Sequence, residues 1–328
     1  LALQVTLTEG ASISPDPSKV MDYSQTRKFT VTSQDGNWHK EYSVIIDTFD
    51  LPFQYDFEHY ELNETGKYQV FFEETQGTAL FKQYIWASGN SGFALTGVGR
   101  NPQEYPTVSI ENGIDGSRAI KLETKSTGQF GETVKMPIAA GNLFLGSFDV
   151  NNAVQKPLKA TLFGLPFGKK PLKFKGYYKY VPGTQSFKAK DKNGNTVTIS
   201  RQEDEGDIYA VLYEAAGLDG KVLDGNNVLT SKNIVALARV EVEKTDRYIE
   251  FETSFQYGER KEISWPQFIY RDPSDDGTGK YLRFSEEKMK NYEYNLAVVF
   301  TSSKYGAYFA GSVGSTLCID KVEIVCEK

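Results

Sequence analysis

Aromatic side chains are the residues of this sequence whose type most clearly offers binding chemistry. The 328 residues include 20 tyrosines, 21 phenylalanines and 3 tryptophans, so 13% of the chain is aromatic. The face of a tryptophan or tyrosine ring can stack on the apolar C–H face of a sugar, while amides, carboxylates and guanidinium groups bond the sugar hydroxyls. The same rings also fill protein cores, so each candidate has two interpretations.

Two tryptophans are candidates for such stacking. Trp86 lies in YIWASGN with Asn90 next to it as a hydrogen-bonding group, although Trp86 can equally pack in a core while GNSG forms a turn. Trp265 lies in ISWPQFIYRD, in an expected loop where ligand contacts often occur. A loop tryptophan beside Pro266 can also pin that loop to the core.

A tyrosine pair is the third candidate. Tyr178 and Tyr180 of GYYKYVPG point to the same face if this segment is a strand. That face is either a stacking platform for a sugar or the edge of an amphipathic core.

Catalytic groups are harder to identify from the sequence. Glycosidases need two carboxylates about 5–5.5 Å or about 6.5–9.5 Å apart, and 43 acidic residues offer many pairs. Asp204, Glu205 and Asp207 cluster in RQEDEGDIYAV, where like charges can raise one pKa, but the sequence favours a solvated turn before a strand. His39 and His59 suggest neither a catalytic triad nor a zinc site without carboxylate help.

Charge and hydropathy exclude several classes of partner. The net charge of −6 argues against nucleic acid, which requires a basic face. No polybasic segment is present to bind anionic lipid, and no run of about 18 apolar residues predicts a membrane span. The first residues already alternate like a strand, so we expect any export signal to have been removed before this numbering begins.

Short alternating segments separated by Gly, Asn, Asp and Pro must position these residues, which predicts an all-β protein. Residues 1–48 fit a small immunoglobulin-like module, in which Asp35-Gly36 joins two alternating runs as a hairpin. Residues 49–328 contain too many strands for one sheet and fit a jelly-roll β-sandwich. Residues 257–290 are an expected long polar loop with one helical turn at SEEKMKNY.

The two cysteines fall in one expected strand. Cys318 and Cys326 are separated by eight positions, which span roughly 26 Å when extended. A disulfide bond between them would need a sharp turn in that strand.

Several phrases resemble one family. KFTVTSQDGNWHKEYSVII resembles the small domain that precedes many surface lipoproteins of Bacteroides. Six ordered segments of the large domain resemble the putative carbohydrate metabolism domain family of gut Bacteroidetes: IWASGNSGFAL (85–95), GSRAIKLET (116–124), IAAGNLFLGSF (138–148), ATLFGLPFGKKPLKFKGYYKYVPG (160–183), DIYAVLYEA (207–215) and TSSKYGAYFAGSVGSTLCIDKVEI (301–324).

The resemblance implies an exported protein, in the outer membrane as a lipoprotein or in the periplasm, anchored only through a lipid on a removed N-terminal cysteine. That family is also similar in architecture to jelly-roll carbohydrate-binding modules, many of which hold a structural calcium ion. By that resemblance Glu58 and Asp320 match the acidic calcium ligands, and backbone carbonyls would have to complete the site. Both acids can otherwise be ordinary surface groups or strand-end caps.

The leading interpretation is a non-catalytic protein that binds a glycan or oligosaccharide, in company with other surface glycan-uptake proteins. A glycoside hydrolase is the first alternative, and it predicts a deep cleft with two facing carboxylates. A structural or adhesive surface protein is the second alternative, and it predicts that the candidate aromatic residues are buried.

Overall fold

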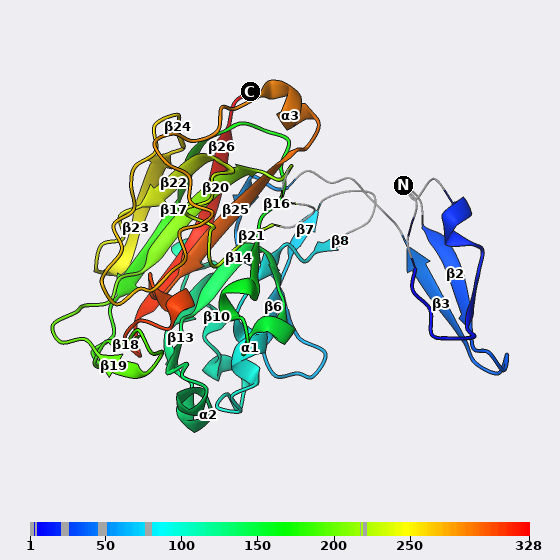
Figure 1. Ribbon diagram of the computed structural model, residues 1–328, viewed down its shortest axis with the longest axis horizontal. Helices are drawn as coiled ribbons and strands as arrows, with labels where there is room; N and C mark the ends of the chain where they lie inside the picture. The colour runs from blue at the N-terminus through cyan, green and yellow to red at the C-terminus, as the bar shows by residue number, and fades with distance from the viewer. Residues whose placement is uncertain are drawn as a thin grey trace. The chain divides into compact units, whose positions relative to one another are not determined.

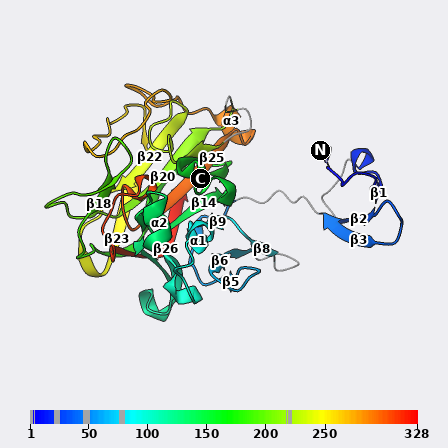
Figure 2. The same cartoon turned by 60° about the horizontal axis from the view of Figure 1, so that its bottom comes forward.

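The structure, a computed structural model, describes residues 3, 5–20, 26–44, 51–75, 81–216, 218 and 222–328. The chain divides into two units, Leu1–Asp50 and Leu51–Lys328, against a boundary expected after residue 48. Figures 1 and 2 show both units from two directions. Each unit is described by itself.

The small unit is a three-stranded antiparallel sheet in the order β1-β2-β3, formed by Ser12–Ser14, Arg27–Thr32 and His39–Val44. The hairpin predicted at Asp35-Gly36 is confirmed, because β2 and β3 pair on either side of it. Gly36 has a φ of 71°, and the Asp35 side chain accepts a hydrogen bond from the backbone N–H of Asn37 at 3.1 Å.

The large unit is built on two antiparallel sheets, as predicted for a β-sandwich (Figure 1). The six-stranded sheet has the order β10-β11-β26-β17-β23, with β4 also paired to β26. Its strands are Thr107–Ile110, Ala119–Glu123, Thr316–Cys326, Pro171–Val181, Thr245–Ser254 and, for β4, Gln54–Tyr55.

The nine-stranded sheet has the order β21-β15-β14-β25-β20-β22-β24, with β16 also paired to β25 and β9 to β14. Its strands are Leu223–Asp224, Thr161–Phe163, Asn142–Phe148, Tyr294–Thr301, Asp207–Glu214, Ile234–Val240, Gln256–Tyr257, then Leu165–Pro166 for β16 and Trp86–Ala87 for β9.

The main core lies between the two sheets. Phe174 on β17 and Phe300 on β25 meet there with ring centroids 6.1 Å apart. Strand β20 contributes Ile208, Ala210 and Leu212 to this core. The alternate residues of β20 belong to a second apolar cluster on the other side of the nine-stranded sheet, so β20 is buried on both faces. That second side carries the candidate site.

Short ribbons and helices complete the large unit. The ribbons are β5 with β6 (Tyr60–Leu62, Gln69–Phe71), β7 with β8 (Glu73–Thr75, Phe81–Gln83), β12 with β13 (Lys125–Ser126, Ile138–Ala139) and β18 with β19 (Lys188–Lys190, Thr196–Thr198). The helices are α1 (Asn90–Ala94), α2 (Gly128–Thr133) and α3 (Glu286–Lys290). Helix α3 confirms the helical turn expected in SEEKMKNY, whereas α1 forms where only a turn was expected.

Two further observations concern the cysteines and the helices. Cys318 and Cys326 both lie in β26 and are free thiols, as their separation along one strand predicts. Among the described residues, no helix has the length and apolarity needed to cross a membrane.

Candidate functional site

A cleft of about 890 Å³ lies on the side of the nine-stranded sheet that faces away from the main core. Its floor is a row of residues that are in register on four neighbouring strands. Phe144 on β14 lies opposite Val299 on β25, which lies opposite Tyr209 on β20, and Tyr209 lies opposite Arg239 on β22. All four residues line the cleft. The register of the sheet therefore sets the spacing of the floor.

An ion pair fixes the charged end of this floor. Arg239 donates hydrogen bonds from Nε and Nη2 to the two carboxylate oxygens of Asp207, at 2.9 and 2.7 Å. Asp207 is buried, and the Arg239 side chain is 23% exposed. Burial would lower the pKa of Arg239, but the facing carboxylate raises it above its usual value. The pair is thus a fixed, charged and geometrically rigid part of the site.

Three aromatic side chains form one wall of the cleft. Trp265 contacts Tyr308 edge-on with ring centroids 5.9 Å apart, and Tyr305 with centroids 6.4 Å apart. All three line the cleft and are only partly buried. A small apolar cluster that includes Phe187 and Ile269 lies against them. A wall of accessible rings on a packed base is the arrangement that stacks on sugar rings.

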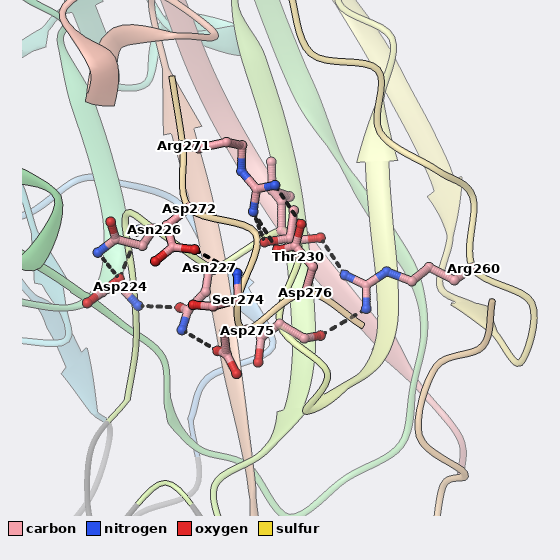
Figure 3. Close-up of polar contacts among 12 residues, drawn as sticks. Asp224, Asn226, Asn227, Thr230, Arg260, Arg271, Asp272, Ser274, Asp275 and Asp276 are labelled. Atoms are coloured by element: carbon pink, nitrogen blue, oxygen red, sulfur yellow. Dashed lines mark hydrogen bonds and ion pairs between the residues drawn. The ribbon is translucent and has the colours of Figure 1, made fainter. Parts of the chain in front are cut away.

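Arg271 contacts Trp265 but is not itself part of the cleft lining. Its guanidinium carbon lies 4.9 Å from the centre of the Trp265 ring, within the range of a cation–π interaction. The two Nη atoms of Arg271 bond both carboxylate oxygens of Asp276, and Nη2 also donates to Thr230 Oγ1 at 2.8 Å (Figure 3). Arg271 is therefore fixed on two sides while it contacts the tryptophan.

A wider polar network joins the two loops that carry these groups (Figure 3). Arg260 donates to the backbone carbonyls of Ser231 and Leu229 at 2.9 and 3.1 Å. Asn227 donates to Asp275 at 2.8 Å. A Cβ at Gly277 would lie 2.3 Å from Arg260 Nη1 and 2.9 Å from Lys232 Cα, so a larger residue there would displace these groups. These contacts hold the long polar loop expected from the sequence against the loop that follows β21.

The acidic cluster at 204–207 is not the solvated turn that the sequence favours. Asp204 is 3% exposed, and one of its oxygens accepts hydrogen bonds from Ser303 Oγ, Ser312 N and Ser315 Oγ at 2.6, 2.7 and 2.7 Å. Burial raises the pKa of Asp204, although these donors oppose the increase. The prediction was wrong because the segment between β25 and β26 folds over Asp204 and supplies these donors. Asp204 ties together the chain segments that carry Asp207 and Tyr305.

The lining of the cleft is mixed in polarity. Its apolar side chains include Phe130, Val134, Phe148 and Val154. The carboxylates that line the cleft are Glu205, Asp207, Glu241, Glu259 and Glu262, and the cationic groups are Arg239, Lys261 and Lys304. The lining therefore carries two more negative than positive charges.

The structure places Trp86 and Asn90 in the interior, so the stacking site expected at these two residues is not there. Trp86 is 4% exposed, contacts Tyr55 edge-on at 5.0 Å and donates from Nε1 to Glu73 at 2.7 Å. Asn90 is fully buried and exchanges two hydrogen bonds with the backbone of Thr107, at 2.8 and 3.1 Å. Neither side chain has a free surface for a ligand.

The stacking platform expected at Tyr178 and Tyr180 is also absent. Tyr178 and Tyr180 do share a face of β17, as the alternation predicts, but this face points into the core and each residue is 2% exposed. The Tyr178 hydroxyl accepts a hydrogen bond from the backbone N–H of Glu243 at 2.9 Å. The alternation of a strand does not reveal which face is covered, and here the second sheet covers it.

Of the expected stacking residues, the structure brings only Trp265 to the cleft. The other members of the site, Tyr209, Arg239, Tyr305 and Tyr308, were missed. Tyr305 and Tyr308 had one signal in the sequence, because two tyrosines occur three positions apart in SKYGAYF. Tyr209 and Arg239 had no such signal in the sequence, because they lie within strands whose pairing brings them together.

The residues present do not fit the calcium site that the resemblance implies. Asp320 is fully buried, and its oxygens accept hydrogen bonds from Ile114 N, Ser117 Oγ and Lys321 N at 2.7, 2.8 and 2.7 Å. Glu58 accepts one from the backbone N–H of Arg118 at 2.9 Å. Calcium requires oxygen ligands rather than N–H donors at these positions. Within the described ranges, no group of three or more acidic, histidine or cysteine side chains could hold a metal ion.

Comparison with known proteins agrees with the resemblance. Residues 56–325 match the putative carbohydrate metabolism domain family, and residues 1–46 match the SGBP N-terminal family, of surface glycan-binding proteins. None of the curated proteins matches the chain.

Two solved structures are similar over most of their length. A protein of Bacteroides thetaiotaomicron VPI-5482, described as a putative glycoside hydrolase, is 41% identical with a TM-score of 0.76, and the match covers 98% of this chain and 85% of that one. A protein of Bacteroides vulgatus ATCC 8482 with the same description is 35% identical with a TM-score of 0.66, covering 85% of this chain and 100% of that one. The chain therefore belongs to the putative carbohydrate metabolism domain family.

Proposed function

We propose that this protein binds a glycan in the cleft on the nine-stranded sheet and that Trp265 is the principal stacking residue. The observation that carries the proposal is the wall of Trp265, Tyr305 and Tyr308 beside a floor that contains Tyr209 and the Arg239–Asp207 pair. Rings that stack and charged groups that accept or donate to hydroxyls are the two requirements for sugar recognition. The family and the SGBP N-terminal match support the same function.

The protein is an exported or surface protein, as the SGBP N-terminal match and the Bacteroides relatives indicate. The finer proposal is an outer-membrane lipoprotein, anchored through a lipid that precedes this numbering, that delivers glycan to other uptake proteins of the same surface. Labelling of intact cells with an antibody to the large unit tests the location. Accessible antibody is the expected result, and signal only after lysis would contradict it.

Binding can be tested by electrophoresis through native gels that contain one polysaccharide each. A panel of plant and host polysaccharides should include at least one that retards the wild-type protein. Retardation should be lost in the Trp265→Ala variant and kept in Trp38→Ala, since Trp38 is 51% exposed but lies in the small unit. Failure of the whole panel to retard the wild type would contradict the proposal.

Glycoside hydrolysis is the second candidate, because five carboxylates line the cleft and both Bacteroides relatives are described as putative glycoside hydrolases. Asp207 is unsuited to be the general acid, since its bidentate bond to Arg239 stabilises the ionised form. Glu205 is engaged in an ion pair with Lys304, so Glu241, Glu259 and Glu262 remain. Release of reducing ends from a bound glycan, abolished by one of the three Glu→Gln changes, would establish hydrolysis. Binding without release of reducing ends would dismiss it.

A further inference from the structure

Two of the three cations that line the cleft are already neutralised by neighbouring carboxylates. Arg239 forms the bidentate pair with Asp207. Lys304 lies 2.6 Å from a carboxylate oxygen of Glu205. Arg271, which contacts Trp265 but does not line the cleft, is likewise held by Asp276. These groups can donate hydrogen bonds to a ligand, but they offer little net positive charge to an anion.

The remaining carboxylates of the lining have no such partners. Glu241, Glu259 and Glu262 are exposed and line the cleft, and none forms an ion pair with another residue of the part that the structure describes. Lys261 is the one lining cation without an ion pair in the same part of the chain. Three unpaired negative charges thus face one unpaired positive charge.

We infer that the cleft selects glycans of uncharged sugars and rejects those that carry uronate or sulfate groups. This inference rests on the proposed function and adds the class of ligand. A carboxylate of the protein accepts hydrogen bonds from neutral hydroxyls, which makes it a favourable partner for a neutral sugar. An acidic sugar brings a second negative charge close to the first in a partly enclosed space, where repulsion exceeds its value in bulk water. Juxtaposed like charges suppress wrong partners in this way.

The test uses three forms of the same polysaccharide. A β-glucan, an α-glucan and a galactomannan are each compared with a derivative whose primary alcohols are oxidised to carboxylates, and with the methyl ester of that derivative. Calorimetry should show binding of at least one neutral form. Its carboxylate form should bind at least tenfold more weakly, and its methyl ester should recover most of the affinity. The difference should shrink between about 10 mM and about 1 M salt, as the screening length falls from about 30 Å to about 3 Å.

The results separate this inference from the proposed function. A carboxylate form that binds as tightly as its methyl ester would overturn the charge selection and leave glycan binding intact. Binding of heparin, chondroitin sulfate or polygalacturonate, while every neutral form fails to bind, would also overturn the charge selection and leave glycan binding intact. If no neutral or acidic glycan binds at all, glycan binding fails and the selection fails with it.

A set of variants tests the named carboxylates. Glu241→Gln, Glu259→Gln and Glu262→Gln, combined in one chain, keep an oxygen acceptor at each position but remove the charge. The tenfold discrimination should fall to about twofold. The matched control combines Glu64→Gln, Glu250→Gln and Glu287→Gln, which are also exposed but lie outside the cleft lining. Unchanged discrimination in the cleft variant, or an equal loss in the control, would overturn the inference.

Discussion

The Arg271 guanidinium lies 4.9 Å from the centre of the Trp265 ring, and the same group is bound to Asp276 and Thr230. One arginine therefore links the stacking residue to the loop network of Figure 3. Because its two Nη atoms are engaged, the guanidinium cannot turn without breaking several hydrogen bonds. The orientation of Trp265 depends on this link as well as on its own packing.

Removing Arg271 should weaken glycan binding although Arg271 does not line the cleft. Arg271→Ala leaves Trp265 without its cation–π partner, which is worth about 0.5–1 kcal/mol, and loosens the ring. We expect affinity to fall about twofold to fivefold by calorimetry, with a red shift in the tryptophan emission. Arg271→Lys keeps a charge but not the bidentate geometry, so its affinity should be intermediate.

The matched control is Arg247→Ala, an exposed arginine on β23 outside the cleft lining. Its affinity and emission should equal those of the wild type. Equal affinity of Arg271→Ala and wild type would show that Trp265 does not need this support.

The ion pair of the floor makes a prediction about stability. Asp207→Asn leaves the Arg239 guanidinium mostly buried beside a neutral group, and the loss of one partner of such a pair typically costs about 3 kcal/mol. Partial exposure of Arg239 should reduce this cost to about 2 kcal/mol. The double variant Asp207→Leu with Arg239→Met should recover most of the free energy of unfolding, measured with urea. A double variant as unstable as the single one would contradict this account.

The sequence predicted most of the fold because alternation and turn residues are local signals. The Asp35-Gly36 hairpin, the strand that contains both cysteines and the helical turn at α3 all follow from nearby residues. Helix α1 was missed because Gly and Ser in GNSG favour a turn, while the buried Asn90 and Phe93 stabilise the helix through tertiary contacts.

The site was less predictable because burial depends on partners that are distant in the chain. Trp86 and Tyr178 are of the residue types that stack on sugars, but the opposite sheet covers them. Tyr209 and Arg239 are neighbours only through the pairing of β20 with β22. In the sequence, Asp204 looks like part of an ordinary charged turn. Serines about 100 positions later in the chain bury it and donate hydrogen bonds to it. No local pattern contains this information.

Glu73 should make stability depend on pH. Its burial raises its pKa to about 7 from 4.5, with the Trp86 hydrogen bond opposing and the Asp56 charge adding to the increase. Since the native state binds this proton more tightly than the unfolded chain, its stabilising contribution is complete below pH 4.5 and is lost as pH rises to about 7. The loss approaches about 3 kcal/mol, at 1.36 kcal/mol per pH unit.

Urea unfolding at about pH 5 and about pH 8 measures this contribution. Glu73→Gln should lose markedly less stability between the two pH values than the wild type does. The neighbouring Glu74→Gln, which changes an exposed carboxylate, should behave like the wild type. An identical loss of stability in Glu73→Gln and wild type would refute the assignment.

Calcium removal should have little effect on stability. Three protein donors satisfy the Asp320 carboxylate, so the native state does not need an ion there. Treatment with a chelator should shift the melting temperature by less than about 2 °C, and added calcium should not raise it, since 1 kcal/mol corresponds to about 2–4 °C for a chain of this size or somewhat smaller. Stabilisation by several degrees on addition of calcium would contradict the interpretation. Asp320→Ala should instead destabilise the protein by about 2 kcal/mol, because buried donors lose their acceptor.

Calorimetric titration of a retarding polysaccharide into wild type, Trp265→Ala and Trp38→Ala tests the central claim most directly. If the cleft binds glycan through its aromatic wall, Trp265→Ala should remain folded and lose at least tenfold in affinity, equivalent to 1.4 kcal/mol or more. Trp38→Ala should match the wild type. Full affinity in Trp265→Ala, or loss in Trp38→Ala alone, would contradict a glycan site in this cleft.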